Sequence, residues 1–299
     1  MSLTVLTPGL CSLLVDAGRP SHRSLGVPVG GAADRAAWML GNALVGNPPD
    51  ALALEVTLLG PSLRVEHPTV AVVQGAAFEP KVNGVPVTPG YTFALHADDV
   101  LTVGGTPTGA RGYLCVAGGF DGPTVLGSRS GLAPLIAGDT LPCPAATGPV
   151  GRSLPPTTDP TTLGALDGRQ ADWFAAGFFE RVYTVAPASD RMGVRLLGEP
   201  LTRRPQSSKW ELVSEPVAPG AVQVTNDGRP VVLGADGQTI GGYPKVAYVV
   251  RADLDTVAQL RPGRQVRFRR VTLDEADRLA KERAERLRRW LVRLAVTAR

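Results

Sequence analysis

Short runs of β-branched and apolar residues, each ended by glycine, proline or asparagine, recur along most of this chain. Glycine and proline supply 35 and 27 of its 299 residues, a density that suits many short strands joined by tight turns. Between residues 51 and 141 the runs follow one another at a spacing of about ten residues, as in β-sandwiches and barrels. The same pattern returns between residues 181 and 271. The chain is therefore predicted to be mainly β.

Six prolines fall between residues 142 and 163 and predict a loop or linker there. We therefore expect residues 1–160 to form an N-terminal β-rich, barrel-like domain. Residues 161–299 are expected to form a C-terminal β-barrel domain that ends in a helix. Within these domains, Asn83-Gly84 and Asn226-Asp227-Gly228 have the composition of hairpin turns.

Two segments have the apolar spacing of a helix. Residues 34–45 predict a short helix, because Asp34 can cap its start and glycine and proline follow its end. Residues 273–296 predict the one long helix, with Thr272 and Glu275 as its capping box. The apolar face of the long helix is predicted to consist of Leu273, Ala276, Ala280, Leu287 and Leu294.

The formal net charge of +4 is concentrated in that last helix. Residues 278–299 carry eight Lys or Arg and two Glu, a net charge of +6, so the rest of the chain has −2. This distribution predicts a solvated helix face or a contact with another protein chain. It gives no basic stripe of the kind that binds nucleic acid.

No run of about 18 apolar residues predicts a membrane span, and the start of the chain does not have the pattern of a secretion signal. Three widely spaced cysteines, Cys11, Cys115 and Cys143, fit neither a disulfide framework nor a zinc site. We therefore expect a cytoplasmic protein without a bound metal.

Several catalytic signatures are missing. The glycines at 104, 105 and 109 lack the Gly-Lys-Ser/Thr of a phosphate-binding loop. Residues 127–131, GSRSG, have Arg129 where a nucleophile elbow has serine. The three histidines, at 22, 67 and 96, are too scattered to predict a triad or a metal site. The chain also has no Met-Lys-Met biotin attachment segment.

Three polar segments interrupt the strand pattern and are candidate ligand-binding loops. Asp34 follows a glycine pair and Arg129 lies in LGSRS; each also fits a purely structural role, as a helix cap and in an Arg–Asp pair. In SDRMG, residues 189–193, a carboxylate beside a guanidinium can anchor a carboxylated substrate or simply tie a loop. We take Asp190 and Arg191 there as candidate substrate anchors.

The fourth segment, DGQTIGGYPK at 236–245, is the strongest candidate. Adjacent glycines expose backbone N–H groups that suit an oxyanion, and a lysine can neutralise developing negative charge. Glu215 is its best acidic companion, and a carboxylate near a lysine is a reasonable acid/base pair. The candidate residues of the segment are Gln238, Thr239, Gly241, Gly242, Tyr243 and Lys245.

Six motifs in order cover residues 3–271: GVPVGGAADRAAWMLGNALVGNP, LALEVTLLGPSLRV, VAGGFDGPTVLGSRS, SDRMGVRL, SEPVAPGAVQV and DGQTIGGYPKVAYVVRADL. Together they resemble the family called allophanate hydrolase subunit 2, also named the 5-oxoprolinase C-subunit family or the biotin-dependent carboxyltransferase family. The resemblance implies cyclophilin-like β-barrels and a homologous partner, called subunit 1 or the B subunit. It also implies a third subunit in an ATP-dependent 5-oxoprolinase.

That resemblance leaves three functions open. The leading one is a subunit that acts on a C–N amide or lactam bond, with 5-oxoprolinase as the preferred enzyme. In this reading the complex uses ATP, and the isolated chain is expected to have little activity. The second is carboxyl transfer from biotin carried by another protein, as in urea carboxylase. The third is a regulatory protein that binds a kinase inhibitor, because some members are named antagonists of one. The amidase Ser-Ser-Lys signature is absent, so we do not expect the chain to hydrolyse allophanate alone.

Overall fold

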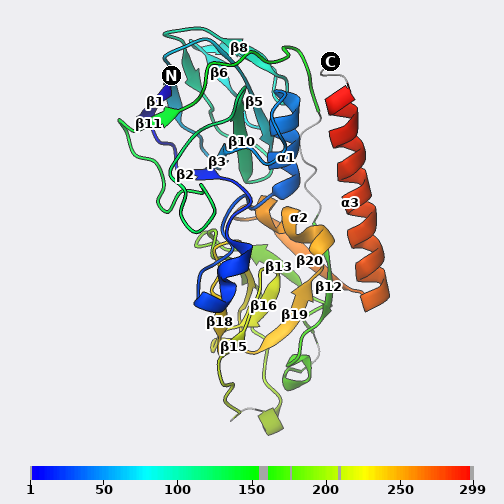
Figure 1. Ribbon diagram of the computed structural model, residues 1–299. Helices are drawn as coiled ribbons and strands as arrows, with labels where there is room; N and C mark the ends of the chain where they lie inside the picture. Colours follow the sequence, from blue (N-terminus) through cyan, green and yellow to red (C-terminus); the bar gives the residue numbers. More distant parts are fainter. Residues whose placement is uncertain (1, 155–160, 176, 208–209, 297–299) are drawn as a thin grey trace. The chain divides into compact units, whose positions relative to one another are not determined.

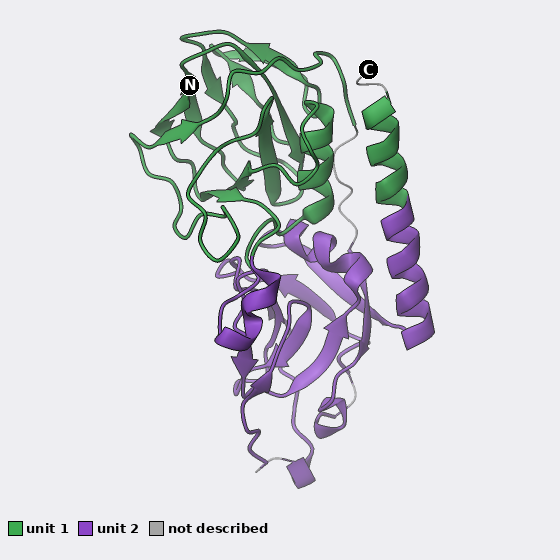
Figure 2. Ribbon diagram, in the orientation of Figure 1, with its two compact units in different colours: residues 1–18, 30–158, 286–299 green, residues 19–29, 159–285 purple. Residues whose placement is uncertain are grey.

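The computed structural model describes residues 2–154, 161–175, 177–207 and 210–296 (Figure 1). The chain divides into two compact units (Figure 2). Unit 1 comprises residues 1–18, 30–158 and 286–299, and unit 2 comprises residues 19–29 and 159–285. Residues 286–299, from the end of the chain, thus belong to unit 1, and residues 19–29, from near its start, belong to unit 2. The prolines at 155, 156 and 160 of the expected linker lie outside the described residues.

Unit 1 consists of two antiparallel sheets around an apolar core. Their orders are β11-β1-β4-β9-β6-β7 and β2-β3-β10-β5-β8. Alternate residues of β1 are buried, whereas β5 and β10 are buried throughout, as expected of central strands covered on both faces. The strands are β1 Ser2–Thr7, β2 Ser12–Val15, β3 Ala53–Thr57, β4 Ser62–Val65, β5 Thr69–Gly75, β6 Lys81–Val82, β7 Val85–Pro86, β8 Phe93–Leu95, β9 Val100–Thr102, β10 Arg111–Val116 and β11 Thr140–Pro142.

The predicted hairpin at residues 83–84 is confirmed. Asn83 and Gly84 link β6 to β7 with φ angles of 50° and 81°. Positive φ at both central positions is the geometry of the type I′ turn.

Helix α1, Arg35–Leu44, confirms the predicted short helix and its cap. The Asp34 carboxylate accepts a hydrogen bond from the Ala37 N–H at 3.0 Å. Trp38 of this helix is 1% exposed, and its Nε1–H donates to the Ala51 carbonyl oxygen. The indole needs both a deep apolar site and an acceptor, and this orientation of the helix supplies both.

A buried glutamate anchors the backbone just before α1. The Glu55 Oε2 accepts hydrogen bonds from the Tyr113 hydroxyl at 2.7 Å and from the Ala33 N–H at 2.9 Å. The same hydroxyl accepts from the Asp34 N–H at 2.7 Å. Burial raises the pKa of Tyr113, so the hydroxyl stays protonated and can donate. The GGAADR segment is thus fixed to strands β3 and β10.

Unit 2 contains a closed barrel, which confirms the predicted mainly β fold with a C-terminal barrel. Its order is β12-β19-β16-β17-β14-β13-β20, antiparallel except where β12 pairs with β20. In β20 the side chains of Val266 and Phe268 are buried between exposed neighbours. The strands of unit 2 are β12 Thr162–Asp167, β13 Val182–Val185, β14 Gly193–Leu197, β15 Glu215–Pro216, β16 Ala221–Val224, β17 Pro230–Leu233, β18 Ile240–Gly241, β19 Lys245–Val249 and β20 Gln265–Arg270.

Strands β15 and β18 form a separate two-stranded ribbon in unit 2. The predicted turn at residues 226–228 joins β16 to β17, and Gly228 has a φ of 76° there. The remaining helices of the described residues are α2 Leu254–Gln259 and α3 Leu273–Val296, with short 3-10 helices η1 Pro20–Leu25, η2 Ala171–Trp173, η3 Pro205–Ser207 and η4 Arg251–Asp253.

Helix α3 confirms the predicted long helix, and the Glu275 N–H donates to the Thr272 hydroxyl oxygen at its start. Ala276 and Leu294 are buried as predicted. Leu273 was expected on the same face but is 66% exposed, because the first residue of the helix precedes its contact with the rest of unit 2. No helix among the described residues has the length and apolar character needed to cross a membrane.

We expect Asp34→Ala to lower the free energy of unfolding by about 1 kcal/mol, because the substitution removes the cap of α1. Asp34→Asn should restore most of the loss, since asparagine also caps. Urea denaturation followed by circular dichroism measures both. The exposed Asp50 gives a control, Asp50→Ala, that should leave the midpoint unchanged.

Candidate active site

A buried lysine and a partly exposed glutamate form an ion pair in unit 2. The Lys245 Nζ lies 2.7 Å from the Glu215 Oε1. The lysine side chain is 1% exposed and the glutamate side chain 22% exposed. The structure thus brings together the two residues that the sequence analysis proposed as an acid/base pair. A lysine so fully buried is unusual and requires a compensating charge.

The pair joins the ribbon to the barrel. Lys245 begins barrel strand β19, whereas Glu215 is in ribbon strand β15, opposite Gly241 of β18. The Lys245 Nζ also donates to the Gly241 carbonyl oxygen at 3.4 Å. One ammonium group therefore contacts both strands of the ribbon, and it fixes the ribbon on the barrel through charge-assisted hydrogen bonds.

Gln170 supports the pair, and the sequence analysis missed it. The Gln170 Oε1 accepts a hydrogen bond from the backbone N–H of Lys245 at 3.0 Å. The backbone N–H of Gln170 donates to the Lys245 carbonyl oxygen at 3.1 Å. Its Nε2 lies 3.4 Å from the Glu215 Oε1. Gln170 follows a strand in a stretch without any recognisable motif, so no local signal could have identified it. Its role arises only from contact with β19.

The close approach of this loop to β19 requires a glycine. A Cβ atom at Gly168 would lie 2.1 Å from the Lys245 carbonyl oxygen, far inside van der Waals contact. Gly168 therefore allows the backbone of the Gln170 loop to reach the lysine.

The Glu215 carboxyl group is ionised at neutral pH. The hydrogen bond from Lys245 lowers the pKa of Glu215, outweighing the opposing effect of desolvation. Arg169 adds positive charge at 3.7 Å from the second carboxylate oxygen. A carboxylate stabilised in this way is a poor proton acceptor. The geometry favours a fixed electrostatic role for Lys245 over acid/base exchange within the pair.

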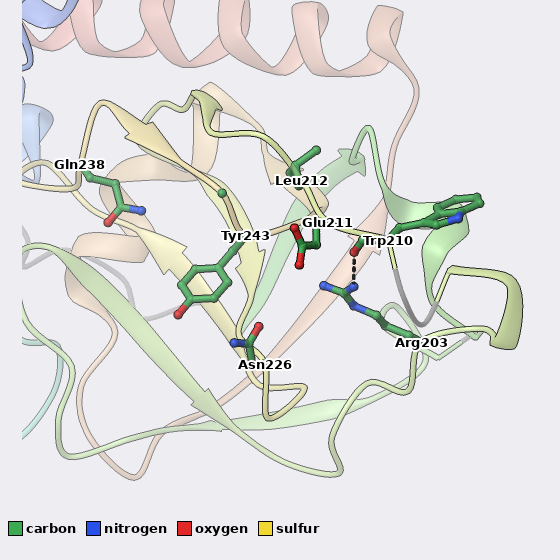
Figure 3. A pocket seen from close by; sticks show the side chains of 8 residues that line it. Arg203, Trp210, Glu211, Leu212, Asn226, Gln238 and Tyr243 are labelled. Atoms are coloured by element: carbon green, nitrogen blue, oxygen red, sulfur yellow. Dashed lines mark hydrogen bonds between the residues drawn. The ribbon is translucent and has the colours of Figure 1, made fainter.

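A cavity of about 540 Å³ adjoins the ribbon (Figure 3). Three of the predicted site residues line it. Gln238 lies just before β18, Gly242 directly follows it, and Tyr243 points its ring into the space. Five lining residues were not predicted as site residues, because four lie in a loop without a recognised motif and Asn226 lies in a turn predicted only for its structure. The lining consists of Arg203, Trp210, Glu211, Leu212, Asn226, Gln238, Gly242 and Tyr243.

An inner layer fixes one wall of the cavity. The Gln238 Nε2 donates to the Oε1 of Gln223 at 3.2 Å, and Gln223 is 2% exposed. A Cβ atom at Gly241 would lie 2.5 Å from the Gln223 Nε2 and 2.7 Å from the Gln238 Nε2. Gly241 is therefore needed for space beside the two amides. Thr239 is 7% exposed, and its carbonyl accepts from the Val217 N–H.

The SDRMG loop holds the loop that leads to Gln238. Arg191 forms a two-pronged ion pair with Asp236, with Nε and NH2 at 2.7 and 2.9 Å from the two carboxylate oxygens. Asp190 accepts from the N–H groups of Met192 and Gly193 within its own turn. Neither Asp190 nor Arg191 is among the residues that line the cavity. Their observed contacts are positioning contacts.

Asp34 and Arg129 belong to unit 1 and form local contacts there. Asp34 caps α1. The Arg129 N–H donates to the Asp16 carboxylate, which also accepts from the hydroxyls of Ser128 and Ser130. The Arg129 guanidinium is 3.5 Å from Asp121 at an exposed position. The observed contacts of both residues stabilise loops.

Within the part of the chain that the structure describes, no group of three or more His, Cys, Asp or Glu side chains is placed to hold a metal ion. The site instead presents a fixed positive charge, neutral amides, aromatic rings and one opposed Arg and Glu. Such a set can bind a small polar molecule and stabilise negative charge on it.

A family model and two related proteins each match most of this chain. The family model named carboxyltransferase domain, subdomain A and B, matches residues 25–270. The 5-oxoprolinase C subunit of Escherichia coli is 32% identical over 92% of this chain and 93% of its own length. The Haemophilus influenzae protein of the same name is 34% identical over 89% and 90%.

A solved structure extends the similarity to a larger enzyme. The Kluyveromyces lactis urea amidolyase superposes with a TM-score of 0.88 at 28% identity. The match covers 97% of this chain but only 20% of the urea amidolyase. The chain therefore corresponds to one part of that enzyme.

We expect Glu215→Gln to destabilise unit 2 more than Lys245→Met does. The first substitution leaves a buried ammonium without its counter-charge, which costs about 3–5 kcal/mol. The second leaves a partly exposed carboxylate that Arg169 and water can still solvate. Chemical denaturation of the two variants measures the difference. Equal losses would contradict the asymmetric burial of the pair.

Removing the Lys245–Glu215 pair should also change how the free energy of unfolding depends on pH in the acidic range. Because the folded-state pKa of Glu215 is lowered, its stabilisation is present above the unfolded-state pKa of about 4.3 and is lost as the pH falls through the folded value. The stability difference between wild type and Lys245→Met should therefore shrink as the pH falls from neutral through that range. Denaturation curves at a series of acidic pH values test the sign.

Proposed function

This chain belongs to the carboxyltransferase-domain family, subdomains A and B, and we propose that it acts as the C subunit of an ATP-dependent 5-oxoprolinase. The observation that carries the proposal is the match to two proteins of that name over nine-tenths or so of both chains. The reaction is hydrolysis of a lactam C–N bond. Water adds its hydroxyl to the carbonyl carbon and a proton to the nitrogen, which opens 5-oxoproline to glutamate.

The site in unit 2 supports this chemistry. Opening a lactam places negative charge on the carbonyl oxygen, and preorganised positive charge or N–H groups stabilise it. We assign Lys245 as a fixed electrostatic group, with Glu215 holding it in place and Gln170 supporting both. The backbone N–H groups of Gly241 and Gly242 are candidate donors to the oxygen.

The other sequence candidates receive supporting roles in the proposal. Gln238 and Tyr243 contact substrate from the cavity wall, and Thr239 supports the ribbon behind them. Asp190 and Arg191 act on substrate through the loop that carries Gln238.

We propose that the active form is a complex. The described residues offer no recognised nucleophile or phosphate-binding loop, so ATP binding and water activation are assigned to other subunits. The names of the two relatives describe them as subunits. The partners we propose are a homologous B subunit, a third subunit and the small-molecule substrate. We place the complex in the cytoplasm, where cysteines that form no disulfide are compatible with the redox state.

A second candidate function is carboxyl transfer from biotin on another protein. It is favoured by the name of the matching family and by the superposition on the urea amidolyase. In that case the same fixed charge would stabilise negative charge on an oxygen of the transferred carboxyl group. A complex with a biotin carboxylase and a biotin carrier, supplied with bicarbonate, ATP and urea, tests it by consumption of carboxybiotin.

The leading proposal predicts glutamate formation by the purified chain mixed with its proposed partners, ATP and 5-oxoproline. Omitting this chain should abolish the product. Lys245→Met should lower kcat/KM at least about tenfold, because the substitution removes the fixed positive charge assigned to stabilise the oxyanion. Glutamate release is measured by chromatography.

Lys281 provides a matched control, because it is an exposed lysine of the same unit. Lys281→Met should turn over like wild type. Circular dichroism shows whether Lys245→Met is folded before its rate is interpreted. Full activity in folded Lys245→Met would exclude the assigned role, and no glutamate from the wild-type complex would exclude the function.

A further inference from the structure

The cavity in unit 2 contains one guanidinium and one carboxylate that point into the same space. Figure 3 shows Arg203 and Glu211 directed toward its centre, with the Tyr243 ring on the other side. No ion pair of 4.0 Å or less joins these two charges, or either of them to another described residue. With respect to the described residues, both charges are therefore available to a ligand.

The guanidinium is held in position. Its NH1 donates to the Trp210 carbonyl at 2.8 Å, and its Cζ lies 5.6 Å from the centre of the Trp173 ring. Trp173 in turn contacts Trp210 edge to face, at 5.2 Å between ring centres. A stacked and hydrogen-bonded guanidinium loses little further freedom when it binds a carboxylate.

Opposite charges in one cavity select against simple ions. A ligand with only a carboxylate is attracted by Arg203 but repelled by Glu211. A ligand with only an ammonium group is attracted by Glu211 but repelled by Arg203. A molecule with both a carboxylate and an ammonium satisfies both groups, with charge-assisted hydrogen bonds at each end. The Asn226 amide, also in the lining, can bind a second polar group of the same molecule.

We propose that this cavity binds a zwitterionic α-amino acid with a polar side chain, its carboxylate on Arg203 and its ammonium on Glu211. The choice of an amino acid as the ligand rests on the proposed function. Ring opening breaks the lactam C–N bond and adds water across it. The proton of the new carboxylic acid then moves to the amine, so a neutral nitrogen becomes an ammonium. The cavity therefore binds the opened product in preference to the lactam.

Isothermal titration of the full chain tests the cavity without its partners. L-glutamate, glutarate and 5-oxoproline are the probes, because glutarate lacks the amine and 5-oxoproline has a neutral nitrogen. We expect glutamate to bind at least about tenfold more tightly than either. Glu211→Gln should remove that preference while leaving glutarate binding intact or improved. Arg203→Met should weaken both glutamate and glutarate.

Glu180→Gln is the matched control, because Glu180 is exposed in the same unit and does not line the cavity. It should bind all three probes like wild type. Equal affinities for glutamate and glutarate, or an unchanged preference in Glu211→Gln, would overturn the inference.

The assembled complex separates this inference from the proposed function. If wild type produces glutamate and Glu211→Gln does so with unchanged inhibition by glutamate, the cavity assignment fails and the function stands. If the wild-type complex produces no glutamate but the isolated chain binds it selectively, the function fails and the cavity assignment stands.

Discussion

The buried Lys245–Glu215 pair connects the barrel of unit 2 with the ribbon, whose second strand lies between Gln238 and Gly242 in the sequence. The ammonium reaches a carboxylate on one ribbon strand and a carbonyl on the other. Removing both charges in favour of well-packed apolar residues is often neutral or stabilising in proteins, so a buried pair contributes more to placement than to stability. Here the placement concerns Gly241, Gly242 and Gln238, which determine one wall of the cavity.

The sequence was sufficient for the fold class, because turn chemistry acts locally. The Asn83-Gly84 hairpin and the Asp34 cap each depend on a few adjacent residues, and both are found as expected. The hydrogen-bond partner of Trp38 was not predictable in the same way, because its indole reaches the Ala51 carbonyl only after the sheets have formed.

In the candidate site, too, residues in a local motif could be predicted, whereas residues brought there by tertiary contacts could not. DGQTIGGYPK drew attention because glycines and polar residues stood where strand residues were expected, and Gln238, Gly242 and Tyr243 do line the cavity. Gln170 and Arg203 are separated from that segment by many residues and carry no motif. Barrel closure brings Gln170 to Lys245, and Arg203 is fixed by stacking on Trp173 and by its hydrogen bond to the Trp210 carbonyl. Such partners are set by tertiary contacts that a single sequence does not encode in a readable pattern.

The assignment of residues 286–299 to unit 1 has a consequence for how the chain matures. During synthesis, strands β1 to β11 leave the ribosome long before the last turns of α3, yet Leu294 is part of their apolar core and its carbonyl accepts from Arg152. Domains made at the N-terminus commonly fold first, but this one lacks a piece of its core until residue 294 has been synthesised. The final helix turns therefore act as a late closure of the first unit, and a chain released early would expose apolar surface in the half that was made first.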